Sequence, residues 1–462
     1  MIRKLSLFIV FSCLSGTLFS QSPISLLWSK DFKNTLNSIN QATDLKIDSH
    51  GNAYALVQSW TPDSTKDIVV IKYDENGNEV WRRIYDNVAH GDDYPSKMAL
   101  DPFENVWVCG ISKLTPQNGD FLITRFTPDG IPDVDIHIDG PDHLFDAATC
   151  IASDKFGNVF AAGYTTSTDS GIDILLVRIR ADGKMAWKKK FGSVQMDVAN
   201  SMIVDDSCNV YFSGVTNSTQ RTSDIIVQKY DSTGRLKWKQ TYDGIFNERD
   251  VSNLITQDDS MNVYVSGFVN HTSDHSDLPV LKYSRNGILL KESVSNGMSS
   301  DCFAVSLRAT NDKIFLTANK EDYGAATLMS VILIYNKAVK EKLYIKSGAD
   351  VRFLNTFSLG NSDFVVGSVL SHPESTLLPM IAAIDTIPKL KWSFADSTVY
   401  GLSHIVQTAV VGNNIYFLGD DAGNATGTVK IFKYKINVAL EERKKPSINK
   451  PINKSGVPKN KR

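Results

Sequence analysis

The chain has 462 residues, with 49 lysines and arginines against 51 aspartates and glutamates, and a formal net charge of −2. Such a chain has no strong field to attract nucleic acid or an anionic membrane, so we expect no nucleic-acid partner. Hydrophobic residues make up 42% of the sequence, which indicates a packed globular protein and excludes general disorder. A chain of this length usually forms several domains unless it is a repeat array.

Residues 1–20 have the features of a cleavable signal peptide. Two basic residues precede an apolar stretch at 5–11, and small residues near position 20 offer a cleavage site before Gln21. The apolar stretch is too short to span a bilayer. Cys13 leaves open a lipidated N-terminus, although Phe11 stands where lipoprotein signals usually have a small residue. We therefore expect a secreted, periplasmic or cell-surface protein, with no transmembrane span and in monomeric form.

The four remaining cysteines do not form a recognisable metal-binding motif. They lie far apart, at Cys109, Cys150, Cys208 and Cys302, and match no metal-ligand spacing. Three of them fall within apolar strand patterns, which predicts small buried side chains. A disulfide between Cys109 and Cys150 stays open as an alternative, because export permits oxidation.

One unit of about 50 residues recurs along almost the whole chain. Its landmark is a turn followed by a strand, as in Gly157-Asn158-Val159-Phe160. The first strand residues of the eight copies lie at positions 53, 106, 159, 210, 263, 314, 364 and 415. The copies are thus separated by 50 to 53 residues, an even spacing that indicates a repeat array and not separate domains.

Each unit contains four strand signals in the same order. The third is a nearly continuous apolar run, such as 68–71, which predicts a strand buried on both faces. The fourth follows a turn glycine and often carries tryptophan, as from Gly183 to Trp187. Four antiparallel strands repeated every 50 residues are typical of a β-propeller blade.

The two ends of the chain predict how the ring closes. The eighth unit has only three strands of its own. Residues 26–32 resemble residues 79–85, the fourth strand of the first unit, and can therefore supply the strand that the eighth unit lacks. We therefore expect an all-β, eight-bladed propeller over residues 24–437, closed by the N-terminal strand. Seven blades would require one unit within 300–400 to be inserted structure. The basic, proline-bearing segment 438–462 is expected to be a disordered tail, with attachment to acidic envelope polymers as a hypothesis.

The repeat resembles the SBBP β-propeller family of secreted bacterial proteins. The resemblance is carried by residues 154–163, 173–177 and 183–187, and it extends well over 42–295 and loosely over 300–437. It implies the fold and says nearly nothing about activity, because the family is defined by its repeat.

A column of tryptophans also resembles the blade motif of quinoprotein dehydrogenases. Its members are Trp81, Trp187, Trp238 and Trp392. In those enzymes the tryptophans dock neighbouring blades and do not bind the cofactor, so the similarity implies architecture. The sequence lacks a vicinal cysteine pair to cover a quinone, and a quinoprotein-like oxidoreductase is kept only as an alternative.

Three columns of aspartate recur in register with the landmark. The first column contains Asp48, Asp101, Asp154, Asp205 and Asp258. The second contains Asp67, Asp120, Asp173, Asp224 and Asp277. The third contains Asp93, Asp146, Asp197, Asp250, Asp301 and, one position out of register, Asp350.

The third column is expected to border the central channel, at the end of the ring that also carries the second column. One hypothesis is that its carboxylates bind a cation or a basic ligand at the channel mouth, and oxygen-only ligands would favour calcium. The other interpretation is structural, because aspartate at the start of a strand commonly accepts backbone N–H bonds and fixes a loop. A residue needed once per blade for geometry must repeat once per blade, so the structural interpretation is preferred for all three columns.

The candidate ligand-binding residues lie in loops that join a fourth strand to the next first strand. They are His90, Asp92, Asp93 and Tyr94 in one loop, Asp142, His143 and Phe145 in a second, and Phe246, Glu248, Arg249 and Asp250 in a third. Aromatic, histidine and charged side chains in loops of a rigid scaffold can recognise a sugar or a peptide. Exposed loops of any secreted protein have a similar composition, which is the alternative explanation.

No catalytic constellation is identifiable from the sequence. The eight histidines are scattered, and the aspartates are so numerous that any pair could be nominated for acid–base chemistry. We therefore predict an exported, non-catalytic binding or scaffold module for a glycan or protein ligand, without a cofactor apart from the calcium hypothesis. The alternative is an envelope hydrolase that uses the channel-mouth carboxylates.

Overall fold

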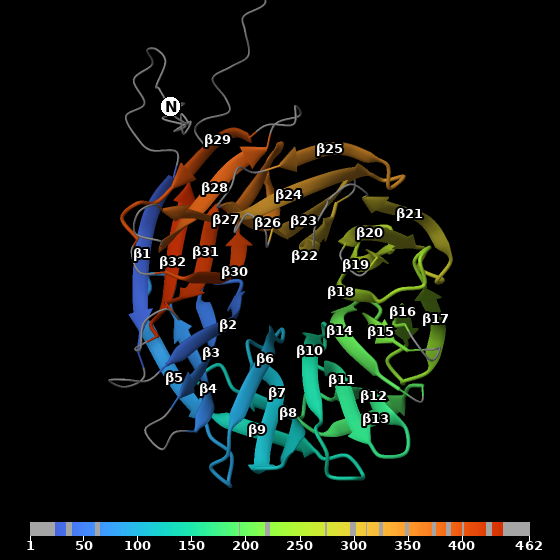
Figure 1. Cartoon of the computed structure of the whole chain (residues 1–462). Helices are drawn as coiled ribbons and strands as arrows, with labels where there is room; N and C mark the ends of the chain where they lie inside the picture. Colours follow the sequence, from blue (N-terminus) through green and yellow to red (C-terminus); the bar gives the residue numbers. More distant parts are fainter. Residues whose placement is uncertain are drawn as a thin grey trace, which may run out of the picture.

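The computed structural model describes residues 24–33, 39–60, 65–193, 195–217, 222–272, 275–295, 302–310, 312–322, 327–346, 351–371, 376–384, 390–399, 402–421 and 427–437. Within these ranges the chain forms 32 strands joined by turns and loops. The strands are arranged as eight four-stranded antiparallel sheets around a central opening (Figure 1).

The first four blades follow the chain from its second strand. Blade 1 contains β2 (Asn40–Ile47), β3 (Ala53–Trp60), β4 (Lys66–Tyr73) and β5 (Glu79–Tyr85). Blade 2 contains β6 (Asp93–Leu100), β7 (Val106–Thr115), β8 (Asn118–Phe126) and β9 (Pro132–Ile138). Blade 3 contains β10 (Ala147–Ser153), β11 (Val159–Ser167), β12 (Gly171–Ile179) and β13 (Met185–Phe191). Blade 4 contains β14 (Asp197–Val204), β15 (Val210–Thr216), β16 (Asp224–Tyr230) and β17 (Leu236–Tyr242).

The other four blades complete the ring. Blade 5 contains β18 (Asp250–Gln257), β19 (Val263–Thr272), β20 (His275–Tyr283) and β21 (Leu289–Ser295). Blade 6 contains β22 (Cys302–Ala309), β23 (Lys313–Asp322), β24 (Thr327–Asn336) and β25 (Glu341–Lys346). Blade 7 contains β26 (Val351–Leu359), β27 (Ser362–Ser371), β28 (Thr376–Ile384) and β29 (Leu390–Ala395). Blade 8 contains β30 (His404–Val411), β31 (Asn414–Asp420), β32 (Val429–Ile436) and, from the other end of the chain, β1 (Ile24–Phe32).

The N-terminal strand closes the ring, as the sequence predicts. β1 pairs antiparallel with β32, with Phe32 opposite Val429 and Ile24 opposite Ile436. Strands from the two ends of the chain therefore lie side by side (Figure 1). The eight-bladed prediction is confirmed. The seven-bladed alternative is wrong, because the segment between 300 and 400 forms two complete blades.

The hydrophobic core is a series of layers between neighbouring blades. One layer joins blades 2 and 3, and another joins blades 8 and 1, where Phe32 packs with Val57 and Ile431. The third strands are buried along nearly their whole length, as the continuous apolar runs predict; in β4 every residue after Lys66 is buried. Each blade therefore depends on the next one to cover its apolar face.

Tryptophans on the outer strands hold neighbouring blades together. The indole N–H of Trp81 donates to the Pro128 carbonyl of blade 2 (2.8 Å), and that of Trp238 donates to the Arg285 carbonyl of blade 5 (3.1 Å). Trp28 and Trp187 make the equivalent bonds. The ring lies against a turn glycine, such as Gly130 with φ +78°, where a Cβ would be 2.8 Å from the Trp81 ring. The sequence comparison with quinoproteins correctly indicates this docking role.

A column of basic residues on the third strands reinforces the same junctions, and the sequence analysis missed it. Lys72 lies over the Tyr54 ring at 5.1 Å and donates to the carbonyl of Pro128, the group that Trp81 also binds. Blade 2 has no outer tryptophan, and there Arg125 donates to a carbonyl of blade 3 at 2.7 Å. The regular spacing of these residues, 19 positions after each of the first five landmarks, was the available signal.

All four described cysteines are buried, and no disulfide joins any two of them. The expectation of buried cysteines is confirmed, and the alternative disulfide between Cys109 and Cys150 is wrong. Burial raises the pKa of the Cys150 thiol to about 12, so the thiol stays protonated and unreactive at neutral pH.

The two chain ends lie outside the described residues. The predicted signal peptide at 1–20, Cys13 and the basic tail at 438–462 all fall there. The described residues contain no helix with the length and apolar character needed to cross a membrane.

Ring closure predicts that two residues of β1 differ greatly in importance. Replacing Phe32 by alanine removes a side chain that is 1% exposed between blades 8 and 1, and we expect it to lower the free energy of unfolding by about 3–5 kcal/mol. Leu27→Ala, at a position 47% exposed in the same strand, serves as the control and should change stability little. Chemical denaturation measures both. Equal effects of the two changes would show that β1 does not seal the ring.

The tryptophan junctions predict a smaller and separable effect. Trp81→Phe keeps an aromatic ring between blades 1 and 2 but removes the indole N–H donor, so we expect a loss of about 1 kcal/mol in unfolding free energy. Trp60→Phe is the matched control, because Trp60 is 37% exposed at a blade edge. If thermal unfolding is unchanged in the Trp81 variant, the indole bond does not contribute to stability.

Candidate functional site

The three predicted ligand-binding loops connect an outer strand to the next inner strand. They are β5–β6, β9–β10 and β17–β18, and they share one backbone shape, with a positive φ at His90 (53°), His143 (54°) and Asn247 (47°). Because the strands of each blade alternate in direction, these loops lie at the same end of the ring as the β3–β4 and β7–β8 hairpins. The structure therefore places all three loops at one end of the propeller.

The third aspartate column supports these loops from inside. The Asp146 carboxylate accepts from the Gly140 N–H at 2.6 Å and from the Thr166 N–H at 2.9 Å, so it ties its own loop to β11. Asp93, Asp197 and Asp250 make equivalent bonds, and all four side chains are at most 1% exposed. They begin or directly precede first strands, which surround the central opening (Figure 1). Asp301 and Asp350 lie outside the described residues.

This burial changes the interpretation of the channel-mouth hypothesis. In the described blades the carboxylates of the third column point into separate loops, where backbone donors already occupy their oxygens. The geometry thus favours the structural role over an exposed carboxylate ring. Cation binding stays a prediction.

Burial also changes the protonation of two of these carboxyl groups. Burial, opposed in part by hydrogen bonds from Asn87, raises the pKa of Asp93 to about 6. Burial raises the pKa of Asp250 to about 7, with a further contribution from the nearby Asp243 and Asp224 carboxylates. Protonation of these groups therefore changes near neutral pH.

The first aspartate column has a structural role in every described copy. Asp48 accepts from the backbone N–H groups of His50 and Asn52, both at 2.9 Å, and from the hydroxyl of Tyr54 at 3.1 Å. Asp101, Asp154, Asp205 and Asp258 fix their turns in the same way. This is the loop-supporting interpretation that the sequence favours.

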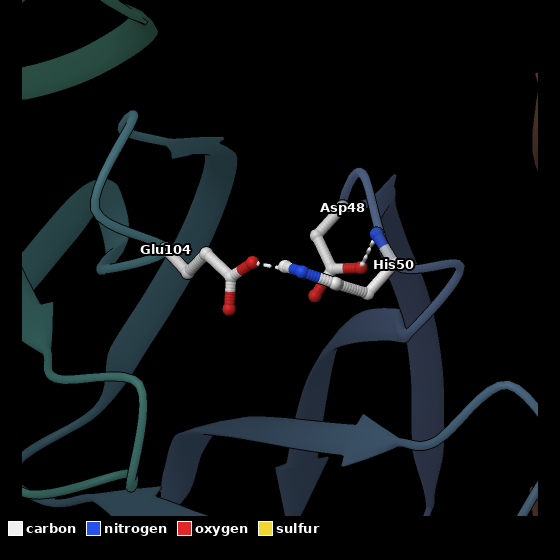
Figure 2. A group of neighbouring side chains, drawn as sticks. All are labelled: Asp48, His50 and Glu104. Carbon is white, nitrogen blue, oxygen red and sulfur yellow. Dashed lines mark hydrogen bonds and ion pairs between the residues drawn. The ribbon is translucent and has the colours of Figure 1, made fainter.

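Two side-chain groups in the described chain could in principle hold a metal ion. One combines Asp48 with His50 and Glu104 from the neighbouring blade (Figure 2). The Asp48 carboxylate already accepts hydrogen bonds from the backbone of its own turn. The other two residues, His50 and Glu104, form an ion pair at 2.5 Å. The other group is Asp67, Asp86 and Asp93, where the second and third aspartate columns meet. In the second group, Asp93 already accepts from Asn87 and Asp86 already pairs with His90.

Two of the three predicted loops contribute to one aromatic and cationic cluster. Tyr94 lies between Lys66 at 4.8 Å and Lys113 at 5.5 Å from its ring, and Lys113 also lies 5.7 Å from the Phe145 ring. Asp92 accepts from the Tyr94 hydroxyl at 2.9 Å and pairs with Lys113 at 3.7 Å. We call the set Trp60, Lys66, Asp92, Tyr94, Lys113 and Phe145 the rim cluster.

The rim cluster contains three residues that the sequence analysis missed. Trp60 lies 5.1 Å from the Lys66 Nζ, and both residues belong to the β3–β4 hairpin of the preceding blade. Lys113 belongs to β7. The sequence places these residues in or beside the hairpins between second and third strands. Only the packing of blades 1 to 3 brings them to the predicted loops. Trp60 and Phe145 are 37% and 43% exposed, so the cluster presents aromatic surface to solvent.

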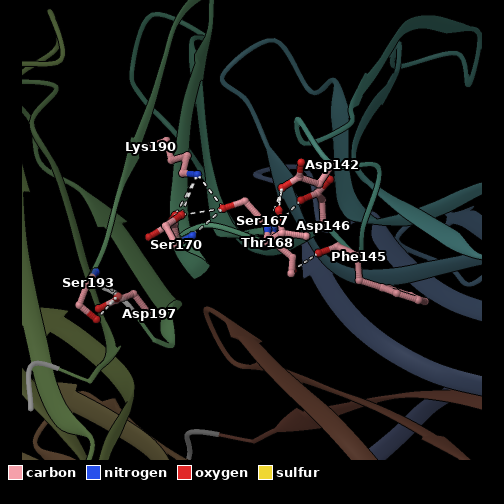
Figure 3. Close-up of polar contacts among 11 residues, drawn as sticks. Asp142, Phe145, Asp146, Ser167, Thr168, Ser170, Lys190, Ser193 and Asp197 are labelled. Atoms are coloured by element: carbon pink, nitrogen blue, oxygen red, sulfur yellow. Dashed lines mark hydrogen bonds and ion pairs between the residues drawn. The ribbon is translucent and has the colours of Figure 1, made fainter. Parts of the chain in front are cut away.

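The histidines and Asp142 have local partners. His90 pairs with Asp86 at 2.6 Å, and His143 pairs in the same way with Asp139. This partner raises the pKa of His143. Asp142 accepts from the Thr168 N–H at 2.7 Å, which joins its loop to the β11–β12 hairpin (Figure 3).

The third predicted loop stands apart from the rim cluster. Phe246 is 40% exposed, and the Arg249 guanidinium lies 5.9 Å from the Phe268 ring of its own blade. Glu248 is exposed in the same loop. The β13–β14 loop separates this loop from β9–β10 along the ring, so the structure does not unite the three loops into one site.

A serine and lysine network lies in blade 3 near these loops (Figure 3). Lys190 lies 3.3 Å from the Ser167 hydroxyl, 3.2 Å from the Ser170 hydroxyl and 2.9 Å from the Asp173 carboxylate. Lys190 donates to both hydroxyls and pairs with the buried Asp173 carboxylate, so its ammonium group is fully engaged within the hairpin. The network thus stabilises the β11–β12 hairpin.

Comparison with known proteins finds only remote structural similarities. No family model matches the chain, and no curated protein matches it. Among solved structures, the propeller domain of the Trilobed protease from Pyrococcus furiosus is 8% identical, with a TM-score of 0.43, over 76% of this chain and 94% of that one. Drosophila Plexin A in complex with Semaphorin 1b is 12% identical, with a TM-score of 0.41, over 89% of this chain and 87% of that one.

A further similarity is to a much larger protein. The acylaminoacyl peptidase of Pyrococcus horikoshii is 9% identical, with a TM-score of 0.42, over 82% of this chain and 57% of that enzyme. At such low identity and similarity, none of these proteins supports an inference about activity or ligand.

The raised pKa of Asp250 predicts a distinctive dependence of stability on pH. A carboxyl whose pKa is higher in the folded than in the unfolded state stabilises the fold at low pH, and this contribution is lost as pH rises through about 7. The unfolding free energy of the unchanged protein should therefore fall between pH 5 and pH 8. In Asp250→Asn this fall should be smaller by roughly 2 kcal/mol. Urea unfolding at both pH values measures this difference.

Asp258→Asn provides the opposite control. Burial opposes ionisation of Asp258, but hydrogen bonds from Asn262, Tyr264 and Ser260 outweigh it and lower the pKa. Its stabilising contribution is therefore present at neutral pH and lost toward acid, so this variant should lose stability at pH 8. An unchanged pH slope in Asp250→Asn would contradict the assignment of the titrating group.

Proposed function

We propose that this protein is an exported, non-catalytic β-propeller that binds a glycan or protein ligand through the rim cluster. The supporting observation is the convergence of exposed aromatic rings with two lysines and one carboxylate at the junction of blades 1 to 3. Aromatic faces accept the apolar side of a sugar ring or a peptide side chain, and the charged groups can orient polar substituents. Loops on a rigid scaffold are the usual place for such recognition.

Export and family membership belong to the same proposal. The signal-like features of residues 1–20 support export to the periplasm, the cell surface or the medium. The blade motif supports kinship with SBBP-type repeats, whose sequence pattern it resembles. We expect a monomer, because the closed ring leaves no open end to which a blade of another copy could be added.

The alternatives lack a favouring observation in the described chain. An envelope hydrolase with acidic catalysis would need accessible carboxylates, whereas Asp146 and Asp250 are buried in separate loops. The tryptophans shared with quinoproteins are engaged in blade docking. The binding module is therefore the function with the most support.

The proposal predicts which substitutions abolish ligand binding. The chain starting at Gln21 should bind saturably to members of a glycan or peptide array, and Tyr94→Ala or Phe145→Ala should weaken that binding about tenfold or more. Phe156→Ala is the matched control, because Phe156 is 60% exposed in the turn between β10 and β11, at the other end of the ring. Calorimetric titration with the selected ligand measures the change.

Three results would contradict the proposal. The array could show no saturable binding, or the Phe156 variant could lose as much affinity as the Tyr94 variant. Turnover of an array member that disappears in Asp146→Asn would instead establish the hydrolase alternative.

A further inference from the structure

The outer strands of blades 3 and 4 carry a concentration of positive charge. Residues 184–191 contain four lysines, residues 235–242 contain two lysines and one arginine, and neither segment contains an acidic residue. The other described outer strands differ, since β9 carries two aspartates and β21 has one lysine and one glutamate. Although the chain as a whole is nearly neutral, the outer strands of two neighbouring blades are therefore locally basic.

Most of these cations are available to solvent. Lys188, Lys189 and Lys239 are exposed, and none of them forms an ion pair with another described residue. Lys190 is paired with Asp173 at 2.9 Å, and Lys237 lies 3.9 Å from Asp231. Unpaired exposed lysines repel one another, so an anionic partner would relieve a repulsion that the fold by itself leaves in place.

Positive charge from the two strands meets at the blade junction. Lys189 of β13 reaches the β16–β17 turn, where a Cβ at Gly234 would lie 3.2 Å from its Cε, next to Arg235. Between the two outer strands lies a cleft of about 230 Å³. Its walls include Phe191, Tyr230, Leu236, Gln228 and Lys239. The Asp197 carboxylate also lines it, but its oxygens accept hydrogen bonds from Ser193 and Thr216. The rings of Phe191 and Tyr230 are stacked with their centroids 5.5 Å apart.

The cleft combines the features that a charged sugar needs. Aromatic and aliphatic side chains offer a surface for the C–H face of a sugar ring, and Gln228 and Lys239 add polar groups. The volume is below the roughly 300–1,000 Å³ of pockets that enclose drug-sized ligands, which suits a single sugar unit within a chain that continues along the surface.

Protection of exposed strand edges does not account for the pattern by itself. Lysine on an outer strand discourages pairing with another chain. That requirement applies equally to every outer strand, yet the other described outer strands meet it with mixed charges or few charges. The excess on blades 3 and 4 calls for a reason specific to those two blades.

We propose that the outer strands β13 and β17 form a docking surface for a linear acidic polysaccharide with carboxylate groups along its length. The lysines contact successive carboxylates, and the cleft between the blades receives one sugar ring. This surface lies on the outer wall of the propeller and is separate from the rim cluster, so each site can be tested without the other.

Direct binding to polygalacturonate tests the proposal. The chain from Gln21 should bind this linear polyuronate at low ionic strength, and binding should weaken as salt is added because the contacts are screened. The triple variant Lys188→Gln, Lys237→Gln and Lys239→Gln should bind about tenfold or more weakly. Uncharged dextran should not bind.

A second triple variant controls for total charge. Lys291→Gln, Lys340→Gln and Lys435→Gln remove the same number of exposed lysines from other blades and should leave polygalacturonate binding unchanged. Circular dichroism of both variants checks that the fold is kept. Phe145→Ala should also bind polygalacturonate normally, because the rim cluster is a different site.

Several results would overturn the proposal. They are a lack of binding to polygalacturonate, an equal loss of affinity in the two triple variants, and equal binding to dextran. Binding to duplex DNA or to vesicles of anionic phospholipid without binding to polygalacturonate would also overturn it, and would identify a different anionic partner.

Discussion

At three of the described blade junctions, one backbone carbonyl accepts hydrogen bonds from two side chains of the preceding blade. The Pro128 carbonyl accepts from the indole of Trp81 and from Lys72, and the Arg285 carbonyl accepts from Trp238 and Lys229. A propeller blade cannot bury its apolar faces alone, so its stability depends on fixing the angle to its neighbours. These shared acceptors, together with the aromatic side chains packed around them, help to set the angle between blades. At the closure, Trp28 of β1 makes the same kind of bond between blades 8 and 1.

The repeated aspartates have a related purpose at the two ends of the blades. The first column fixes the turns between first and second strands, and the third column fixes the loops between blades. Since both sets are used for geometry, the loops they hold can vary at the remaining positions. The rim cluster takes Asp92, Tyr94 and Phe145 from such loops, which is why we assign recognition to it.

The candidate site was predictable only in part. Tyr94 and Phe145 were identified from the sequence, because aromatic residues in interblade loops interrupt an otherwise regular repeat. Trp60, Lys66 and Lys113 were not, since their positions suggest solvated hairpins. Their relation to Tyr94 depends on the lateral packing of three blades, and sequence spacing carries no information about distances across that junction. The same limitation applies to Asp250, whose raised pKa arises from burial.

The sequence by itself determined the number of blades, the order of strands and the closure by residues 26–32. These features are periodic, and a periodic pattern of apolar residues, turn glycines and tryptophans follows from local strand geometry and burial. The tertiary structure alone decided which carboxylates are buried, which cysteines stay unpaired and which side chains from different blades meet. Those properties depend on how far and at what angle separate sheets approach. Contacts that every junction repeats, such as those of the tryptophans, leave a regular spacing in the chain, whereas contacts made only once, as in the rim cluster, do not.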